Sequence, residues 1–172
     1  MDTLQALMTA LEREREGEKQ YRAAAAGSHS QKAKKMFEWL AQEESGHVRL
    51  MELSLEEFKN NSRWLPQDAW ESEGFLTEPI QSEELPPKPS VTGELSPDAP
   101  ELEIIKKAIE AEKADADFYK EMAKNVDDPS GEIALEKLAQ VEQGHVALLE
   151  EEYQWIRHSK DLFTLHKFLP AG

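Results

Sequence analysis

Two copies of the pattern Glu-x-x-His are the residues of this chain best suited to chemistry. They are Glu44 with His47 and Glu142 with His145. Residues three apart project from one face of a helix, and in the first copy that face also carries Leu40 at core spacing. A carboxylate among core positions is costly unless it is paired, protonated or bound to a cation. The sequence therefore predicts that both pairs belong to a buried polar site.

Two further glutamates are placed to join these pairs. Glu14 and Glu112 each precede a tyrosine by seven residues and an ExxH glutamate by 30. Short turns near residues 27–29 and 126–128 would bring each one level with its pair. The resulting layer would hold four carboxylates and two imidazoles with no Lys or Arg on the seam, and two divalent cations would balance its charge. We therefore predict a two-metal site formed by Glu14, Glu44, His47, Glu112, Glu142 and His145.

The chemistry of these ligands limits the choice of metal. Carboxylate oxygens and imidazole nitrogens without thiolate suit iron or manganese, and zinc would also bind. A carboxylate can bridge two metal ions while each imidazole terminates one, and this arrangement matches the known di-metal pattern of ferritin-like bundles. We expect two iron ions, with manganese or zinc as alternatives.

Three more residues lie where they could influence the site. Tyr21 and Tyr119 share a helix face with Glu14 and Glu112. We expect their hydroxyls to hydrogen-bond a carboxylate rather than to act as a radical or electron relay. Asp115 follows Glu112 by three residues and is expected to be a nearby carboxylate rather than a constant ligand. No catalytic residue beyond the metal ligands is predicted.

An internal repeat organises the chain. Residues 10–55 align without a gap with residues 108–153, and 15 of the 46 aligned pairs are identical, including the tyrosine and both members of ExxH. Helical periodicity runs through both copies. The sequence therefore predicts an all-α four-helix bundle of two hairpins related by a pseudo-twofold axis, with hairpin 1 at about 3–60 and hairpin 2 at about 100–158.

A crossover and a tail make up the rest of the chain. Seven of the nine prolines lie in the crossover, at about 61–100, which we expect to be one long connection. Apolar residues such as Trp64 and Trp70 should pack part of it on the bundle. The tail, 159–172, allows one more short helix before Pro170. The long helices themselves are expected over about 3–26, 30–60, 100–125 and 127–158.

Composition excludes several classes of protein. The formal net charge of −15 disfavours nucleic acid as a partner. The chain has no cysteine, which rules out disulfides, iron–sulfur clusters and a built-in rubredoxin-type iron centre. No stretch approaches the roughly 20 apolar residues of a membrane span, and the N-terminus does not have the pattern of a signal peptide. We therefore expect a soluble cytoplasmic protein that does not bind membranes.

The double ExxH, with an upstream glutamate seven residues before a tyrosine, resembles the rubrerythrin-type branch of the ferritin-like superfamily. The resemblance covers both hairpins. It implies a single ferritin-like domain over residues 1–172 and a di-iron centre that reacts with peroxide or dioxygen. The chain departs from rubrerythrin proper because it lacks the Cys-rich module that supplies electrons, so an external electron donor is implied. It also has His145 where a further glutamate is typical, and Asp115 where a longer glutamate reaches the metal.

Several functions are compatible with this resemblance. The first expectation is a di-iron oxidoreductase that reacts with peroxide or dioxygen. The alternatives are a ferroxidase or iron-sequestering protein, a dimanganese catalase, and a metal-stabilised module without turnover. A homodimer or a larger homo-oligomer is expected.

Overall fold

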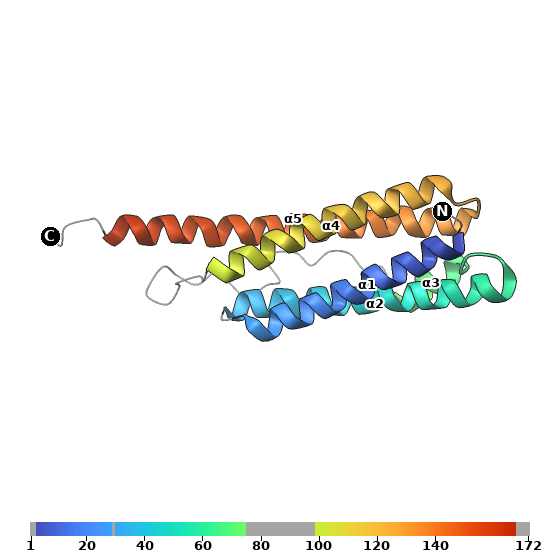
Figure 1. Cartoon of the computed structure of the whole chain (residues 1–172), viewed down its shortest axis with the longest axis horizontal. Helices are drawn as coiled ribbons and strands as arrows, with labels where there is room; N and C mark the ends of the chain where they lie inside the picture. The colour runs from blue at the N-terminus through green and yellow to red at the C-terminus, as the bar shows by residue number, and fades with distance from the viewer. Residues whose placement is uncertain (1–2, 29, 75–98, 168–172) are drawn as a thin grey trace.

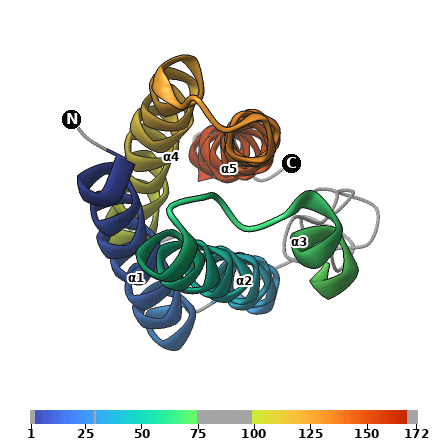
Figure 2. The same cartoon turned by 90° about the vertical axis from the view of Figure 1, so that its right-hand side faces the viewer.

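The computed structural model describes residues 3–28, 30–74 and 99–167, and these form helices and their connections without a strand (Figure 1). Helices α1 and α2 form one antiparallel hairpin, and α4 and α5 form the other. Seen end-on, these four helices surround a common core, and α3 lies outside them (Figure 2). Within the described residues, no helix combines the length and apolarity needed to cross a bilayer. The helices are α1 (Thr3–Gly27), α2 (Gln31–Asn61), α3 (Gln67–Glu73), α4 (Ala99–Asn125) and α5 (Pro129–Lys167).

The predicted all-α bundle of two hairpins is confirmed, and the bounds of α1, α2 and α4 match the expected ones closely. Two details differ. The crossover contains the short helix α3, which the proline content did not predict. Helix α5 continues to Lys167 in one piece instead of ending near residue 158, because no glycine or proline interrupts the chain between Gly144 and Pro170. The crossover residues 75–98 and the tail residues 168–172 lie outside the described residues.

Polar side chains fix where two of the long helices begin. The side chain of Ser30 accepts a hydrogen bond from the backbone N–H of Ala33, as an N-cap does. At the start of α5, Oδ1 of Asp128 accepts hydrogen bonds from the backbone N–H groups of Ser130 and Gly131, at 2.9 and 3.3 Å. Asp128 therefore caps the start of α5, and Pro129 is the first residue of the helix.

The apolar core of the bundle is divided into two clusters. One cluster, near the start of α1 and the end of α2, includes Leu7, Leu50 and Leu135. The other, near the end of α1 and the start of α2, includes Phe37 and Leu149. In each of the four long helices, the predicted site residues lie in sequence between the residues of these two clusters. The predicted site residues therefore form a polar layer between the two apolar clusters.

The described part of the crossover packs on the bundle, as predicted. Trp64 and Trp70 are each only 1% exposed. The backbone N–H of Trp64 donates to Oδ2 of Asp128 at 2.9 Å, so the residue that caps α5 also holds the crossover. A Cβ atom on Gly131 would lie 2.8 Å from the Trp64 ring, and glycine at this position therefore allows the indole to sit against α5.

A buried ion pair links the two hairpins away from the polar layer. The ammonium of Lys32 on α2 donates to the carboxylate of Glu152 on α5, and both side chains are almost fully buried. The same ammonium lies 5.0 Å from the centroid of the Trp155 ring, within reach of a cation–π interaction. This pair helps to fix how far α2 and α5 are shifted along one another.

Candidate metal centre

The polar layer is formed by the six residues predicted as metal ligands. Each hairpin contributes three of them, one glutamate from its first helix and an ExxH pair from its second. Each of the six residues is at most 4% exposed. The structure therefore brings together in one buried cluster, from all four long helices, Glu14, Glu44, His47, Glu112, Glu142 and His145.

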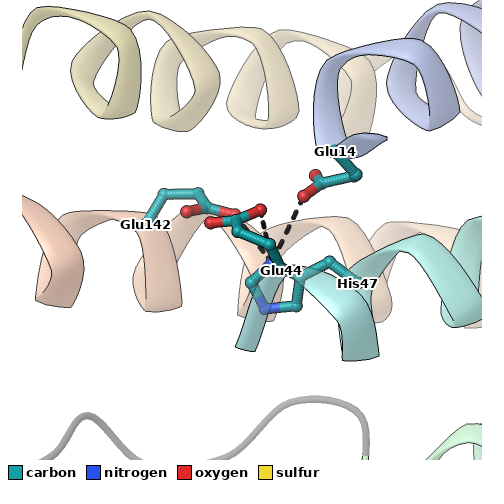
Figure 3. A group of neighbouring side chains, drawn as sticks. All are labelled: Glu14, Glu44, His47 and Glu142. Atoms are coloured by element: carbon teal, nitrogen blue, oxygen red, sulfur yellow. Dashed lines mark ion pairs between the residues drawn. The ribbon is translucent and has the colours of Figure 1, made fainter. Parts of the chain in front are cut away.

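His47 faces carboxylates from both hairpins (Figure 3). Its Nδ1 atom lies 3.3 Å from Oε2 of Glu14 and 3.6 Å from Oε2 of Glu44, both in its own hairpin. The same atom lies 3.2 Å from Oε1 of Glu142, which comes from α5. These four residues offer donor atoms that all lie within 4.8 Å of one another, a spacing at which one metal ion can contact all of them.

His145 has an equivalent set of neighbours. Its Nδ1 atom lies 3.0 Å from Oε2 of Glu142 and 3.5 Å from Oε2 of Glu112, both in its own hairpin. It also lies 3.5 Å from Oε1 of Glu44, on α2. Donor atoms of these four residues again lie within 4.8 Å of one another, so a second metal ion could be held next to the first.

Two carboxylates are common to both groups. Glu44 directs Oε2 toward His47 and Oε1 toward His145, and Glu142 directs its two oxygens to the same pair of rings in the opposite order. The two imidazole rings are nearly parallel, with centroids 5.8 Å apart and an angle of 20° between their planes. Glu44 and Glu142 could therefore be shared by two metal ions held at adjacent sites.

Several donor atoms of this cluster have no hydrogen bond. Both ring nitrogens of His47 and of His145, and both carboxylate oxygens of Glu142, are buried without a hydrogen-bond partner among the described residues. The imidazole–carboxylate contacts of 3.0–3.6 Å are close, but they lack hydrogen-bond geometry. Buried polar atoms are normally satisfied, and metal ions would satisfy these. The donor set therefore fits a pair of metal ions.

Two of the carboxyl groups hold a proton more tightly than an exposed carboxyl does. Burial, together with the charge of Glu44, raises the pKa of Glu14 from 4.5 to about 8. Burial and the charge of Glu112 raise the pKa of Glu142 to about 7, although the two imidazoles oppose this shift. Without a cation, part of the negative charge of the layer is therefore removed by protonation at neutral pH. A bound divalent ion would displace these protons.

The charged form is favoured at Glu112 and at the two imidazoles of the layer. Burial opposes the charge of Glu112, but the positive charge of His145 and the hydrogen bond from Tyr21, acting together with the other polar neighbours, outweigh burial and lower the pKa of that carboxyl. Burial also opposes charge on His47 and His145, yet the surrounding carboxylates raise the pKa of both imidazoles well above 6.5. The metal-free layer therefore balances its charge with protons on the imidazoles and on some of the acids.

The two tyrosines cross between the hairpins. The hydroxyl of Tyr21 on α1 donates to Oε1 of Glu112 on α4, and the hydroxyl of Tyr119 on α4 donates to Oε1 of Glu14 on α1. The expected hydrogen bond from each tyrosine to a carboxylate is therefore confirmed. Each tyrosine bonds the glutamate of the other hairpin, so the pair of hydrogen bonds fixes the orientation of both terminal carboxylates and joins α1 to α4.

Asp115 lies beside the layer and pairs with a cation. The guanidinium of Arg13 on α1 donates to its carboxylate and also lies 4.9 Å from the centroid of the Phe118 ring. Burial raises the pKa of Asp115 to about 6, although Arg13 opposes this shift. Asp115 is absent from both donor groups that the described residues form. The arrangement agrees with the expectation of a nearby carboxylate that is not a constant ligand.

Three residues around the layer were not predicted from the sequence. They are Arg13, Gly17 and Trp39. A Cβ atom on Gly17 would lie 3.3 Å from Oε2 of Glu44, so this glycine leaves room for a bridging carboxylate. The indole of Trp39 meets the ring of His145 edge-on, with centroids 5.6 Å apart. The sequence offered one sign of this arrangement: Gly17 is a glycine inside a helix, at the repeat position of Asp115.

A family model for rubrerythrin matches residues 5–83 and 103–171. These ranges include both hairpins and all six residues of the polar layer. Comparisons with curated proteins and with solved structures find no match. Since the family model spans most of the sequence and the fold is an all-helical bundle of two hairpins, the chain belongs to the rubrerythrin family of the ferritin-like di-iron carboxylate superfamily.

Proposed function

We propose that this chain binds two iron ions in its polar layer and acts as an oxidoreductase that reduces peroxide or dioxygen. One observation carries the proposal. The buried cluster consists of two donor groups that share Glu44 and Glu142, and each group has its own terminal glutamate and histidine. A surface cluster of acids would have neither this burial nor these shared carboxylates.

The charge and the donor types support iron. Four carboxylates and two imidazoles provide oxygen and nitrogen donors without sulfur, which suits iron or manganese better than a structural zinc site. Two divalent ions would match the four carboxylate charges. Family membership adds to this argument. Manganese and zinc are the alternatives that metal analysis has to exclude.

The chain's own residues would position the ions. When ferrous ions are bound, they supply two electrons and an electrophilic site to a peroxide or to dioxygen. The tyrosine hydroxyls hold the terminal carboxylates Glu14 and Glu112 in place.

The electrons for repeated turnover have to come from outside the chain. The sequence has no cysteine, so the chain has no thiolate-ligated iron centre of its own. We propose an external one-electron carrier protein as donor, a homodimer or larger homo-oligomer as the working state, and a cytoplasmic location. The other candidate, iron sequestration, has no observation that favours it over the oxidoreductase.

Metal analysis followed by peroxide titration tests this function. Protein expressed with iron and purified without chelators should contain about two iron ions per chain. After anaerobic reduction, one equivalent of peroxide should oxidise both ions, with a change in the near-ultraviolet spectrum. The variant Glu142→Ala, which removes a shared carboxylate, should lose both responses, and the exposed-site variant Glu12→Gln should keep them. One zinc ion per chain without a redox response would refute the proposal, and many iron ions per chain would indicate storage.

A further inference from the structure

A cavity of about 320 Å³ lies between α1 and α4 and reaches the polar layer. Four of the six layer residues line it, and all four are glutamates: Glu14, Glu44, Glu112 and Glu142. Neither histidine is among its lining residues, and both imidazoles are fully buried. A molecule in this cavity would therefore meet the layer from its carboxylate side.

The walls of the cavity are mainly small and apolar. Ala24 and Ala108 line its inner part, and Ala23, Ala111 and Ile104 line its outer part. The outer three are exposed to solvent, and Ile104 is 40% exposed. The cavity therefore has an apolar passage from the surface and a polar floor formed by the carboxylates. This combination suits a molecule with an apolar body and one polar end.

The size of the cavity argues against hydrogen peroxide as the molecule it is shaped for. A molecule the size of water occupies about 30 Å³ in the liquid, and sites for organic ligands begin at about 300 Å³. Hydrogen peroxide would leave most of the 320 Å³ to water held against alanine and isoleucine side chains. An organic molecule would instead bury its apolar surface there, which is favourable.

The charges around the cavity favour an uncharged molecule. The floor carries carboxylates, which repel an anion when the metal charge is already balanced. Two cations also line the cavity: Arg13 is paired with Asp115, and Lys107 is exposed to solvent, where water and salt screen its charge. Neither offers much to an incoming carboxylate or phosphate. A neutral molecule meets neither of these obstacles.

We propose that this cavity binds an organic hydroperoxide, with its alkyl or aryl body between α1 and α4 and its peroxide group at the carboxylates. This assignment rests on the proposed function, because it names the substrate class of that same site. The reaction breaks the O–O bond of ROOH, which takes up two electrons and two protons and leaves as ROH and water. The electrons come from two ferrous ions in a single turnover, or from the external one-electron carrier in steady turnover.

A cavity-filling variant tests the proposal on the iron-loaded protein. Ala108→Leu adds side-chain volume to the cavity wall, and Ala114→Leu makes the same change on the exposed side of α4, outside the cavity lining. Binding of 2-phenylpropan-2-ol, the product alcohol of cumene hydroperoxide, is measured by calorimetry or ligand-observed NMR. Single turnover is measured for cumene hydroperoxide and for hydrogen peroxide.

The wild type and Ala114→Leu should bind the alcohol alike, and Ala108→Leu should bind it at least about tenfold more weakly. Ala108→Leu should also lower the rate constant for cumene hydroperoxide about tenfold while changing that for hydrogen peroxide less than about threefold. Circular dichroism and iron content establish that the variant is folded. If it is not, Ala111→Leu, at the exposed outer wall, takes its place.

The outcomes separate this assignment from the proposed function. Reduction of hydrogen peroxide without binding of the alcohol, or with equal effects of Ala108→Leu on both peroxides, overturns the hydroperoxide assignment and leaves the oxidoreductase proposal standing. If the iron-loaded protein reduces neither peroxide nor dioxygen, the proposed function is wrong and the hydroperoxide assignment is wrong with it.

Discussion

The metal-free protein should become less stable as the pH rises from 5 to 8. Glu14 is the clearest cause, because burial and the charge of Glu44 raise its pKa from 4.5 to about 8 in the fold. Between these two values the folded chain holds this proton and the unfolded chain has lost it. The unfolded state therefore binds fewer protons, and the free energy of unfolding falls as the pH rises through this window.

The size of the effect follows from these pKa values. Each pKa unit corresponds to about 1.4 kcal/mol, so Glu14 alone should remove about 3 to 4 kcal/mol of stability between pH 5 and pH 8. In a chain of this length, this lowers the melting temperature by roughly 10 °C. Glu142, with its pKa raised to about 7 by burial and the charge of Glu112, acts in the same direction. The lowered pKa of Glu112 matters only at acidic pH, below this window.

Urea denaturation of chelator-treated protein at pH 5, 6, 7 and 8 measures this slope. In Glu14→Gln the titrating group is gone, so the loss of stability over this range should shrink by about 3 kcal/mol. The exposed-site variant Glu12→Gln should behave as the wild type. Iron-loaded protein should show no such decline, because bound metal keeps the carboxylates deprotonated and the imidazoles neutral at every pH in the series. A metal-free stability that is constant or rises with pH, or an unchanged slope in Glu14→Gln, would refute the reasoning.

Three further perturbations test the layer and its surroundings. Glu142→Ala removes a carboxylate that faces both imidazoles, so the iron content should fall from about two ions per chain to nearly none. Glu14→Ala should keep about one iron ion per chain. Elemental analysis measures the iron content of both variants. Tyr119→Phe removes the hydrogen bond to Glu14 and should weaken metal affinity by about 10- to 100-fold at unchanged stoichiometry, measured by competition with a chelator. Lys32→Met leaves Glu152 buried without its cation and should cost about 3 to 5 kcal/mol in urea denaturation. The double variant with Glu152→Met should recover most of this loss, and no recovery would mean that the ion pair does not carry the effect.

The six residues of the layer could be found from the sequence because an α-helix has a constant rise per residue, so spacing in the sequence gives distance along the helix. A gap-free repeat at a constant offset of 98 gives both hairpins the same number of residues between the upstream glutamate and the ExxH pair. Once both hairpins fold alike, a residue such as Glu14 must lie level with its ExxH pair. The cost of burying unpaired acids then limits how the hairpins can face one another, and the structure has the same single layer.

The contacts around the layer could not be found in the same way. Tyr21 lies two turns from Glu14 on its own helix, yet it bonds Glu112 on the other hairpin. The choice between these glutamates depends on how far each helix is rotated about its axis, and spacing within one helix does not fix that.

The helix α3 was missed for a similar reason. It has seven residues, and the burial of Trp70 against the core contributes more to its stability than local propensity does.

The repeat holds at the six layer residues and at the two tyrosines that contact them, and it breaks at Gly17 and Asp115. Inside the layer, charge balance fixes every position, since the loss of any one donor would leave buried partners unsatisfied. Gly17 and Asp115 occupy equivalent repeat positions but act differently: the glycine leaves room for Glu44, and the aspartate pairs with Arg13. Both line the cavity between α1 and α4. The two halves therefore differ at this pair of cavity-lining positions, whereas the four glutamates that line the same cavity repeat between the halves.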